Sequence, residues 1–498
     1  MDGPSSVETQ STGVKGLDRI LKGGLPKNRL YLIEGNPGTG KTTLGLQYLL
    51  EGASKGEACL YVTLSESKEE LTSAAKSHGW SLEGLNILDL ADAGQGLDED
   101  SQYTVFHPSE VELDQTTRTV MKEIERMKPN RVVFDSLSEM RMLAADPLRF
   151  RRQILALKQY FMRCDCTVLM LDDRTSDSPD RQLESIAHGV ISLDYTPNEY
   201  GRQRKSLRVV KMRGLAFQSG EHDFNIETGG LVVFPRLIVE QNELGDITST
   251  PLLSNEENLD ELVGGLHYGT STIVLGPAGV GKSTLTLMYV IAAAERGERS
   301  AIYIFDEGPL TLFARAASLG LELKRYVDQG LVNVRQIQIA ELTPGEFAHM
   351  VSEEVEKNDA RIIIIDSVNG YLMATPQEKF LVMQFHDLLD YLNRKGVISI
   401  MIVGQFGLIG PMSTPIDLSY LADTVILMRY FESGGVIRQA VSLLKKRAGK
   451  HERTIREYRI DHGGIQLSEP LTDFQGVLTG VPVFKGDPSK LMNPSDKR

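Results

Sequence analysis

Cysteine is scarce in this chain, and its scarcity excludes one class of protein. Among 498 residues there are three cysteines, Cys59, Cys164 and Cys166. So few cysteines do not support the disulfide framework of a small secreted domain. Cys164 and Cys166 stand too close together and too isolated to form a zinc site, so we interpret them as core or loop residues.

Long apolar runs and an excess of positive charge are also missing. No run approaches the ~20 apolar residues that span a bilayer, and the first ten residues, MDGPSSVETQ, lack the basic and apolar regions of a signal peptide. We therefore expect a cytoplasmic protein with no membrane span. The formal net charge of −13 disfavours nonspecific attraction to nucleic acid, although local basic grooves remain compatible with it.

Two glycine-rich segments are present instead, EGNPGTGKTT at 34–43 and LGPAGVGKST at 275–284. Both fit the phosphate-binding pattern G-x-x-x-x-G-K-[ST], and each follows a strand-like apolar run and opens a helix-like one. The glycines are expected to allow backbone conformations closed to other residues, so that N–H groups surround an anion at a helix N-terminus. The predicted ATP-binding residues are Gly35, Gly38, Thr39, Gly40, Lys41, Thr42, Thr43, Gly276, Gly279, Val280, Gly281, Lys282, Ser283 and Thr284.

Other segments repeat in the same order as the P-loops. GLDRILKGGL at 16–25 returns as NLDELVGGLH at 258–267, and RVVFDSLSEM at 131–140 returns as RIIIIDSVNG at 361–370. The chain is therefore interpreted as a tandem duplication with its seam within 239–258. The predicted domains are 1–240 and 241–484, followed by a short flexible tail at 485–498.

Short apolar runs alternate with longer amphipathic segments in each half. The first half has LYLIEG, CLYVTL, RVVFDS, TVLMLDD, GVISLDY and LRVVKM, which are typical of strands buried on both faces. Gly-Gly pairs in FNIETGGLVVF and YRIDHGGIQL predict hairpins at the sheet edges. The predicted fold class is α/β, with two P-loop domains whose mainly parallel central sheets are covered by helices.

Carboxylates follow the strands that should end near the phosphates. Asp135 and Asp366 each end a buried strand, and together with Thr42 and Ser283 they are predicted to ligate Mg²⁺. Three further acids are candidate catalytic residues that accept a proton from water or from a protein hydroxyl: Glu66, Asp306 and Glu307. The alternative for these three is a helix N-terminal carboxylate that only stabilises the helix dipole.

A basic triplet ends a late strand in each half, KMR at 211–213 and KKR at 445–447. Strand alternation places the first and third residues on one face, so the pairs Lys211 with Arg213 and Lys445 with Arg447 could bind the γ-phosphate of a neighbouring subunit. The alternative is a solvated basic strand end, which implies no ring.

On these residues the chain resembles the KaiC family, the RecA-superfamily ATPases of bacterial clocks and their relatives, over about 12–484. The resemblance implies RecA-like domains and a homohexamer of two stacked rings with ATP and Mg²⁺ between subunits. The first ring would hydrolyse ATP, and the second would phosphorylate and dephosphorylate itself. The matching phosphoacceptor positions are Ser419 and Tyr420, with Thr414 upstream. KaiB-like or two-component signalling proteins are the implied partners.

The two halves differ where the acceptor should lie, because the first half carries Glu184 and Ser185 in place of Ser419 and Tyr420. A carboxylate repels a neighbour's γ-phosphate, whereas hydroxyls can accept it. The chain also departs from the family, which typically has Ser-Thr at the acceptor and a paired acid where Ser65 precedes Glu66. The tail after Phe484 carries little that resembles a KaiA-binding segment. We expect a relative outside the three-component oscillator.

Two other functions remain open on the sequence. A RecA-like recombinase or helicase would use the basic run KKRAGKHERTIR at 445–456 to bind DNA. A nucleotide-gated scaffold with little turnover would serve only to assemble with a signalling partner.

Overall fold

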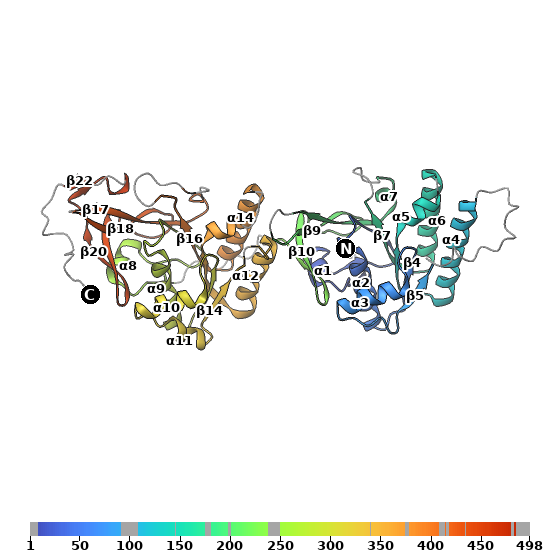
Figure 1. The fold of residues 1–498 in the computed structure, drawn as a ribbon, viewed down its shortest axis with the longest axis horizontal. Helices are drawn as coiled ribbons and strands as arrows, with labels where there is room; N and C mark the ends of the chain where they lie inside the picture. Colours follow the sequence, from blue (N-terminus) through green and yellow to red (C-terminus); the bar gives the residue numbers. More distant parts are fainter. Residues whose placement is uncertain are drawn as a thin grey trace, which may run out of the picture. The chain divides into compact units, whose positions relative to one another are not determined.

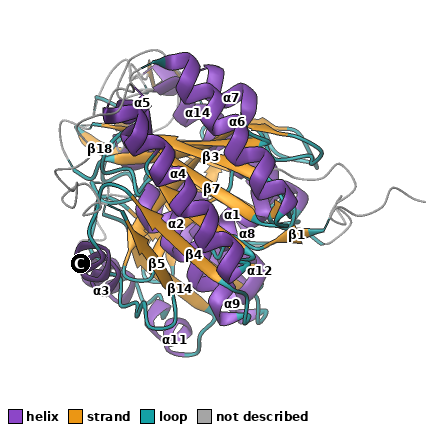
Figure 2. Cartoon of the chain, turned by 90° about the vertical axis from the view of Figure 1, so that its right-hand side faces the viewer, coloured by secondary structure: helices purple, strands orange, loops and turns teal. Residues whose placement is uncertain are grey.

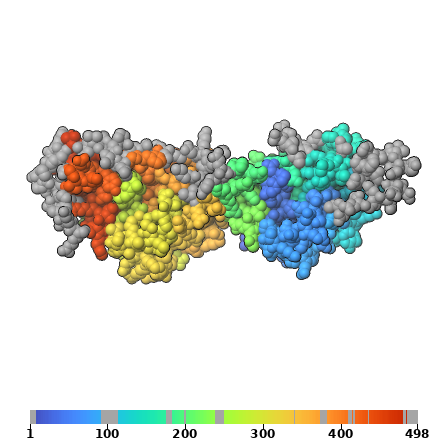
Figure 3. Space-filling view, viewed as in Figure 1, coloured from blue at the N-terminus to red at the C-terminus, as the bar shows by residue number. Residues whose placement is uncertain are grey.

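The chain divides into two compact units, 1–236 and 237–498, each described by itself in a computed structural model. Figure 3 colours the first unit blue to green and the second yellow to red. The structure describes residues 8–90, 108–144, 146–174, 181–197, 201–237, 250–338, 340–373, 378–407, 414, 418–433, 435–479 and 483–484. The predicted seam lies mostly outside these residues, as does the tail at 485–498, so the predicted domain bounds stay a prediction.

The first unit alternates strands with helices in the way that the sequence predicts (Figure 1). Its elements are Thr9–Gln10 (β1), Lys15–Ile20 (α1), Leu25–Pro26 (β2), Leu30–Gly35 (β3), Lys41–Ser54 (α2), Cys59–Thr63 (β4), Lys68–Ser77 (α3), Asn86–Asp89 (β5), Pro108–Met127 (α4), Arg131–Asp135 (β6), Leu137–Ala144 (α5), Pro147–Arg163 (α6), Thr167–Asp173 (β7), Arg181–Ile186 (α7), Gly189–Thr196 (β8), Arg204–Met212 (β9), Glu221–Glu227 (β10) and Gly230–Phe234 (β11).

The second unit repeats the succession of the nine sheet strands, with some different elements between and after them. Its elements are Glu257–Val263 (α8), Ser271–Gly276 (β12), Lys282–Glu295 (α9), Arg299–Ile304 (β13), Pro309–Ser318 (α10), Leu323–Asp328 (α11), Val332–Gln336 (β14), Pro344–Asn358 (α12), Ala360–Asp366 (β15), Val368–Met373 (α13), Glu378–Arg394 (α14), Ile398–Gly404 (β16), Thr424–Ser433 (β17), Val436–Lys446 (β18), Ile455–Asp461 (β19), Gly464–Pro470 (β20), Phe474–Gln475 (β21), Val477–Thr479 (η3) and Val483–Phe484 (β22).

Each unit is built on one nine-stranded sheet of described strands, and the two sheets have the same topology. The orders are β11-β10-β9-β8-β3-β7-β6-β4-β5 and β20-β19-β18-β17-β12-β16-β15-β13-β14. From β8 to β5 and from β17 to β14 neighbouring strands are parallel, and the remaining three strands of each sheet are antiparallel. The predicted hairpins occur where Glu227 pairs with Gly230 and Asp461 with Gly464. The α/β class with two mainly parallel sheets is confirmed.

Alternating side chains of each parallel strand enter two separate cores, which explains why the strands are apolar throughout. In β3, Tyr31 and Ile33 pack with residues of α1 and α2, whereas Leu30 and Leu32 pack with residues of α4, α5 and α6. Figure 2 shows α4 and α6 lying across the strands of the sheet. The second unit has the same two layers, one with α8 and α9 and one with α12 and α14. No helix in the described part of the chain is long and apolar enough to cross a membrane.

Candidate functional site

Each glycine-rich loop connects the central strand of its sheet to the helix that follows, β3 to α2 and β12 to α9. Gly40 and Gly281 immediately precede these helices with φ of 98° and 102°, a left-handed conformation that favours glycine. Neither helix has a side chain that caps its N-terminus. Their first backbone N–H groups therefore remain available to an anion, as phosphate binding requires.

The first glycine of each loop is required for a different reason from the one that the sequence predicts. Gly35 and Gly276 do not have a positive φ. A Cβ at Gly35 would lie 2.3 Å from the carbonyl oxygen of Leu193, and one at Gly276 would lie 2.6 Å from that of Met428. These glycines are thus required by close packing of β3 on β8 and of β12 on β17, not by an unusual backbone conformation.

Three other predicted ATP-binding residues keep their side chains in the protein interior. Thr39, Val280 and Thr284 are buried, and the Thr39 hydroxyl donates to the carbonyl of Asn36 at 2.8 Å. These residues can offer a nucleotide only their backbone. The ATP-binding roles of the loop residues stay predictions.

The two P-loop lysines differ in their partners. Lys41 Nζ donates to the carbonyls of Gly35 and Asn36 at 2.9 and 3.0 Å and lies 2.6 Å from Asp173 Oδ1. Lys282 Nζ donates to the carbonyls of Gly276 and Pro277 at 2.9 and 2.7 Å. Burial lowers the pKa of Lys282, and the charge of Asp366 opposes this shift. The first loop therefore has a carboxylate in direct contact with its lysine.

The predicted metal ligands meet in both units. Thr42 Oγ1 donates to Asp135 Oδ2 at 3.1 Å, and Ser283 Oγ donates to Asp366 Oδ2 at 2.6 Å. Burial raises the pKa of both carboxyls, and these hydrogen bonds oppose the shift. A hydroxyl and a carboxylate oxygen fit Mg²⁺, which usually takes one or two protein ligands together with waters and phosphate oxygens. The described residues contain no group of three His, Cys, Asp or Glu side chains that could hold a metal ion.

The candidate catalytic acids lie at the ends of β4 and β13 but in unlike surroundings. Burial raises the pKa of Glu66, with further contributions from Asp135, Glu70 and Asp173. Glu307 instead accepts two hydrogen bonds from Arg315, at 2.7 and 3.0 Å. Asp306 is exposed and accepts a hydrogen bond from Ser367 Oγ at 2.5 Å.

The basic pair of each half donates hydrogen bonds to backbone carbonyls of one four-residue segment of its own unit, and these carbonyls stand at corresponding positions in the two units. Lys211 Nζ donates to the carbonyls of Glu184 and Ala187 at 2.5 and 2.9 Å, and Arg213 donates to that of Ser185 at 3.1 Å. In the second unit the acceptors are the corresponding carbonyls, with Lys445 bound to Ser419 and Ala422, and Arg447 bound to Tyr420. Both cations of each pair face one way, as strand alternation predicts.

The proposed phosphoacceptor segment therefore sits directly on the second basic pair. Ser419 is half-buried, whereas the Tyr420 side chain is 56% exposed, so its hydroxyl is not sequestered in the core. Thr414 is half-buried. In the first unit, Glu184 and Ser185 occupy the positions of Ser419 and Tyr420. The structure thus supports the alignment between the halves, while phosphorylation and the action of the cations on a neighbour stay predictions.

Three residues at these sites were missed from the sequence. Tyr61 donates to Asp135 at 2.6 Å, Asp173 pairs with Lys41, and Arg315 pairs with Glu307. Asp173 had one usable signal, because it ends an apolar run as Asp135 does. Tyr61 carried none, because it meets Asp135 only through tertiary packing. Arg315 is eight residues from Glu307, a spacing that no motif marks.

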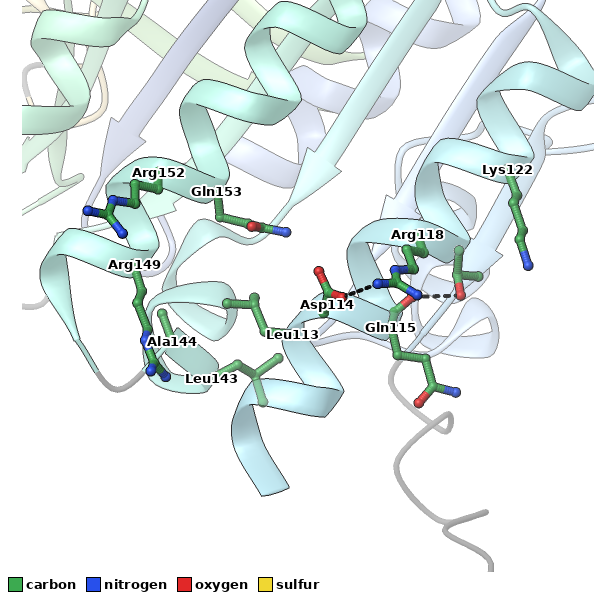
Figure 4. Close-up of a pocket in the computed structure, with 11 residues that line it drawn as sticks. Leu113, Asp114, Gln115, Arg118, Lys122, Leu143, Ala144, Arg149, Arg152 and Gln153 are labelled. Carbon is green, nitrogen blue, oxygen red and sulfur yellow. Dashed lines mark hydrogen bonds and ion pairs between the residues drawn. The ribbon is translucent and has the colours of Figure 1, made fainter. Parts of the chain in front are cut away.

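A separate cavity of about 890 Å³ lies between α4, α5 and α6 (Figure 4). Its lining contains no P-loop residue and includes four cations, Arg118, Lys122, Arg149 and Arg152. Asp114 points toward Arg118 and pairs with it at 2.7 Å. Its described lining residues take no part in the described contacts of the predicted nucleotide sites.

Comparison with known proteins matches both units. A family model described as the KaiC ATPase matches residues 10–238 and 255–472. The circadian clock protein KaiC3 of Synechocystis sp. is 26% identical over 96% of this chain and 95% of that protein. The circadian clock oscillator proteins KaiC of Parathermosynechococcus lividus and Prochlorococcus marinus (strain MIT 9313) are also 26% identical over 96% of this chain, covering 88% and 97% of those proteins.

Proposed function

Because the chain belongs to the KaiC family of ATPases, we propose that it binds ATP and Mg²⁺ at both P-loops, hydrolysing ATP in the first unit and phosphorylating itself in the second. We further propose that it works as a cytoplasmic homohexamer of two stacked rings. Its role would be in timing or signalling, with KaiB-like or two-component proteins as partners. The observation that supports this proposal is that each unit joins a P-loop hydroxyl to a strand-end aspartate by a hydrogen bond. The charge of the P-loop lysine of the same unit lowers the pKa of that aspartate, against the larger effect of burial.

At the first site, Lys41 would bind the β- and γ-phosphates, while Thr42 and Asp135 would hold Mg²⁺. The metal would neutralise charge on the phosphate oxygens. Glu66, which follows β4 and makes no ion pair with another described residue, would accept a proton from the attacking water. Burial raises the pKa of Glu66, which makes it a better base once ionised.

At the second site, Lys282, Ser283 and Asp366 would take the corresponding roles. The Ser419 hydroxyl would attack the γ-phosphorus of a nucleotide held by the neighbouring subunit. The new O–P bond forms as the β–γ bridging bond breaks, ADP leaves, and the hydroxyl proton passes to Glu307 or Asp306. The side chain of Tyr420 is exposed, so we propose its hydroxyl as a second acceptor.

The contrast between Glu184 and Ser419 supports the proposal that the first unit hydrolyses ATP and the second phosphorylates itself. Both positions offer their carbonyl to the basic pair of their own unit, so the two segments are held alike. At the position of Ser419 only the second unit has a side-chain hydroxyl, whereas at the next position both units have one, from Ser185 and Tyr420. A carboxylate at the position of Ser419 cannot accept phosphate in the same way and would repel it.

The recombinase alternative loses part of its support. Of the basic run at 445–456, Lys445 binds Ser419 and Ala422, Lys446 binds the carbonyls of Val263 and Gly265, and Arg456 binds Glu452 and Glu261. Cations engaged in this way are poorly placed to bind a DNA backbone. Stimulation of ATP hydrolysis by single-stranded DNA would nevertheless favour that alternative.

Phosphopeptide mapping after incubation with γ-labelled ATP and Mg²⁺ tests the autokinase. We expect label on the peptide that carries Ser419 and Tyr420, and none after the double change Ser419→Ala and Tyr420→Phe. Label that persists in the double variant would disprove the assignment. ATP hydrolysis without any incorporated label would favour a plain ATPase, and neither activity would favour a scaffold.

A further inference from the structure

The P-loop lysine of the first unit is the only one of the two with a carboxylate in contact among the described ion pairs. Lys41 Nζ lies 2.6 Å from Asp173 Oδ1, and the side chains of Lys41 and Asp173 are 8% and 32% exposed. The same amino group also donates to two P-loop carbonyls. Asp173 therefore occupies one of the directions in which Lys41 can bind a phosphate oxygen.

Asp173 is held in this position by its strand and its neighbours. It ends β7 opposite Gly35 of the central strand, and its N–H donates to Ser138 Oγ at 3.2 Å. The next residue, Arg174, donates its backbone N–H to Gly35 and binds Glu34 and Asp194 at 2.5 and 2.8 Å. These hydrogen bonds and ion pairs fix the end of β7, so the Asp173 carboxylate lies next to the P-loop.

The second unit has the same register with a different residue. Gly404 ends β16 opposite Gly276, as Asp173 ends β7 opposite Gly35. The three atoms nearest to a Cβ at Gly404 would all belong to Asn369, at 3.5 to 3.6 Å, which is ordinary van der Waals contact. The second site therefore has no carboxylate at this position, and a Cβ fits there without a clash.

We propose that Asp173 is a built-in competitor of nucleotide phosphate at the first P-loop, and that Gly404 leaves the second P-loop without this competition. A triphosphate must exchange the Asp173 carboxylate for its own oxygens on Lys41, so this contact weakens nucleotide binding at the first site. The inference rests on the proposed function, because it concerns the same P-loops. It adds a residue-level reason for the two halves to differ in nucleotide affinity.

Reciprocal substitutions in the full chain test this. Lys282→Ala isolates the first site and Lys41→Ala isolates the second, and binding of a non-hydrolysable ATP analogue with Mg²⁺ is measured by calorimetry. In the Lys282→Ala chain, Asp173→Asn should lower the Kd of the analogue about fivefold, as expected for loss of a partly exposed ion pair. In the Lys41→Ala chain, Gly404→Asp should raise the Kd by a similar factor, whereas Gly404→Ala should leave the Kd nearly unchanged. The Asp173→Asn effect should shrink at high salt.

The outcomes separate the two claims. If the unsubstituted chain binds no nucleotide, the proposed function fails. If both P-loops bind but Gly404→Asp leaves Kd unchanged, or folded Asp173→Asn binds no more tightly than its parent, the competition is disproved. Because the two variants lie in different units, misfolding of one, seen by circular dichroism, leaves the other decisive.

Discussion

Tyr61 donates its hydroxyl to Asp135 Oδ2 at 2.6 Å, while Thr42 donates to the same oxygen at 3.1 Å. The strand pairings place Ile302 where Tyr61 stands, because Thr63 is opposite Asp135 and Ile304 is opposite Asp366. Asp366 therefore has no tyrosine hydroxyl at this position. The two proposed metal ligands are built alike in the backbone and differ in how many hydrogen bonds stabilise the carboxylate.

Tyr61→Phe should weaken Mg²⁺ binding at the first site. The hydrogen bond from Tyr61 lowers the pKa of Asp135 against the larger effect of burial, so its loss disfavours the ionised form that a metal needs. We expect the half-saturating Mg²⁺ concentration for ATP hydrolysis to rise about three- to tenfold in the Lys282→Ala background.

Tyr303→Phe is the matched control for Tyr61→Phe. Tyr303 is a buried strand tyrosine of the second unit whose hydroxyl has no hydrogen-bond partner in the described structure. Its loss should leave Mg²⁺ dependence unchanged. An equal effect of both variants would contradict a specific role for Tyr61.

Glu66→Gln should abolish most hydrolysis in the first unit. Loss of a general base typically costs about a hundredfold or more in rate, and the amide keeps the shape of the side chain. Nucleotide affinity should change little, since Glu66 makes no contact with the P-loop lysine in the described structure. Turnover is measured in the Lys282→Ala background, and a rate within about threefold of the parent would remove Glu66 from this role.

The pH profile gives a second test of Glu66. Its pKa is raised above the ordinary glutamate value of 4.5, and the ionised form is the active base. As the pH falls, the rate should therefore begin to decline at a higher pH than an ordinary glutamate would allow. A rate that stays constant down to the ordinary glutamate range would contradict this assignment.

Arg315→Met should increase phosphate transfer at the second site. Arg315 binds both carboxylate oxygens of Glu307, which keeps their lone pairs from a substrate proton. We expect incorporation of label to rise about three- to tenfold in the Lys41→Ala background. Arg325→Met is the control, because Arg325 binds Glu322 in an exposed pair on α11. A fall in incorporation would show instead that Arg315 holds Glu307 in its productive position.

Much of the scaffold follows from local patterns in the sequence. Runs such as LYLIEG and TVLMLDD become β3 and β7 because an uninterrupted apolar strand is stable only when helices cover both faces. The P-loops were found because glycine, lysine and hydroxyl occur at fixed spacing between a strand and a helix. Because the strand-like runs occur in the same order in both halves, each half supports the prediction of strands in the other, and the two nine-stranded sheets agree with this.

The remaining features of the sites depend on contacts between distant parts of the chain. Lys41 and Asp173 meet only because β3 and β7 are neighbours in register, which no local pattern encodes. The prediction that Gly35 needs an unusual backbone conformation is also wrong, because this glycine is required by the nearby carbonyl of Leu193, which only tertiary packing brings close.

Arg131→Met should destabilise the first unit by about 3 kcal/mol, the usual cost of breaking a buried ionic contact. Arg131 is fully buried, binds Glu57 and the carbonyls of Ser11 and Tyr48, and lies 4.6 Å over the Tyr48 ring. Urea unfolding is followed by the fluorescence of Trp80, the single tryptophan of the chain. Arg361→Met in the second unit is the control and should not shift this transition. A decrease of less than about 1 kcal/mol in the free energy of unfolding would contradict the importance of these contacts.

His188 should make the stability of the first unit depend on pH. Its Nδ1 accepts a hydrogen bond from the Leu30 N–H at 3.2 Å, where the second unit uses Asp423 to accept from Ser271. Burial, and then the charges of Lys158, Arg29 and Arg213, lower the pKa of His188 from 6.5 to about 4. The unfolded chain therefore binds more protons than the folded one between these values, so stability is fully present above pH 6.5 and is lost as the pH falls toward 4.

His188→Asn retains an acceptor for the Leu30 N–H and removes the titrating group. Because His188 is partly exposed and screened by solvent, we expect the parent to lose about 1 kcal/mol more than the variant between pH 7 and 5. Burial also lowers the pKa of His222, but that residue is present in both proteins and its contribution cancels. Urea midpoints at several pH values, read from Trp80, provide the comparison. Parallel pH dependence in the two proteins would mean that His188 stays neutral in the unfolded chain or is protonated without cost in the folded one, and either result would refute this account of its environment.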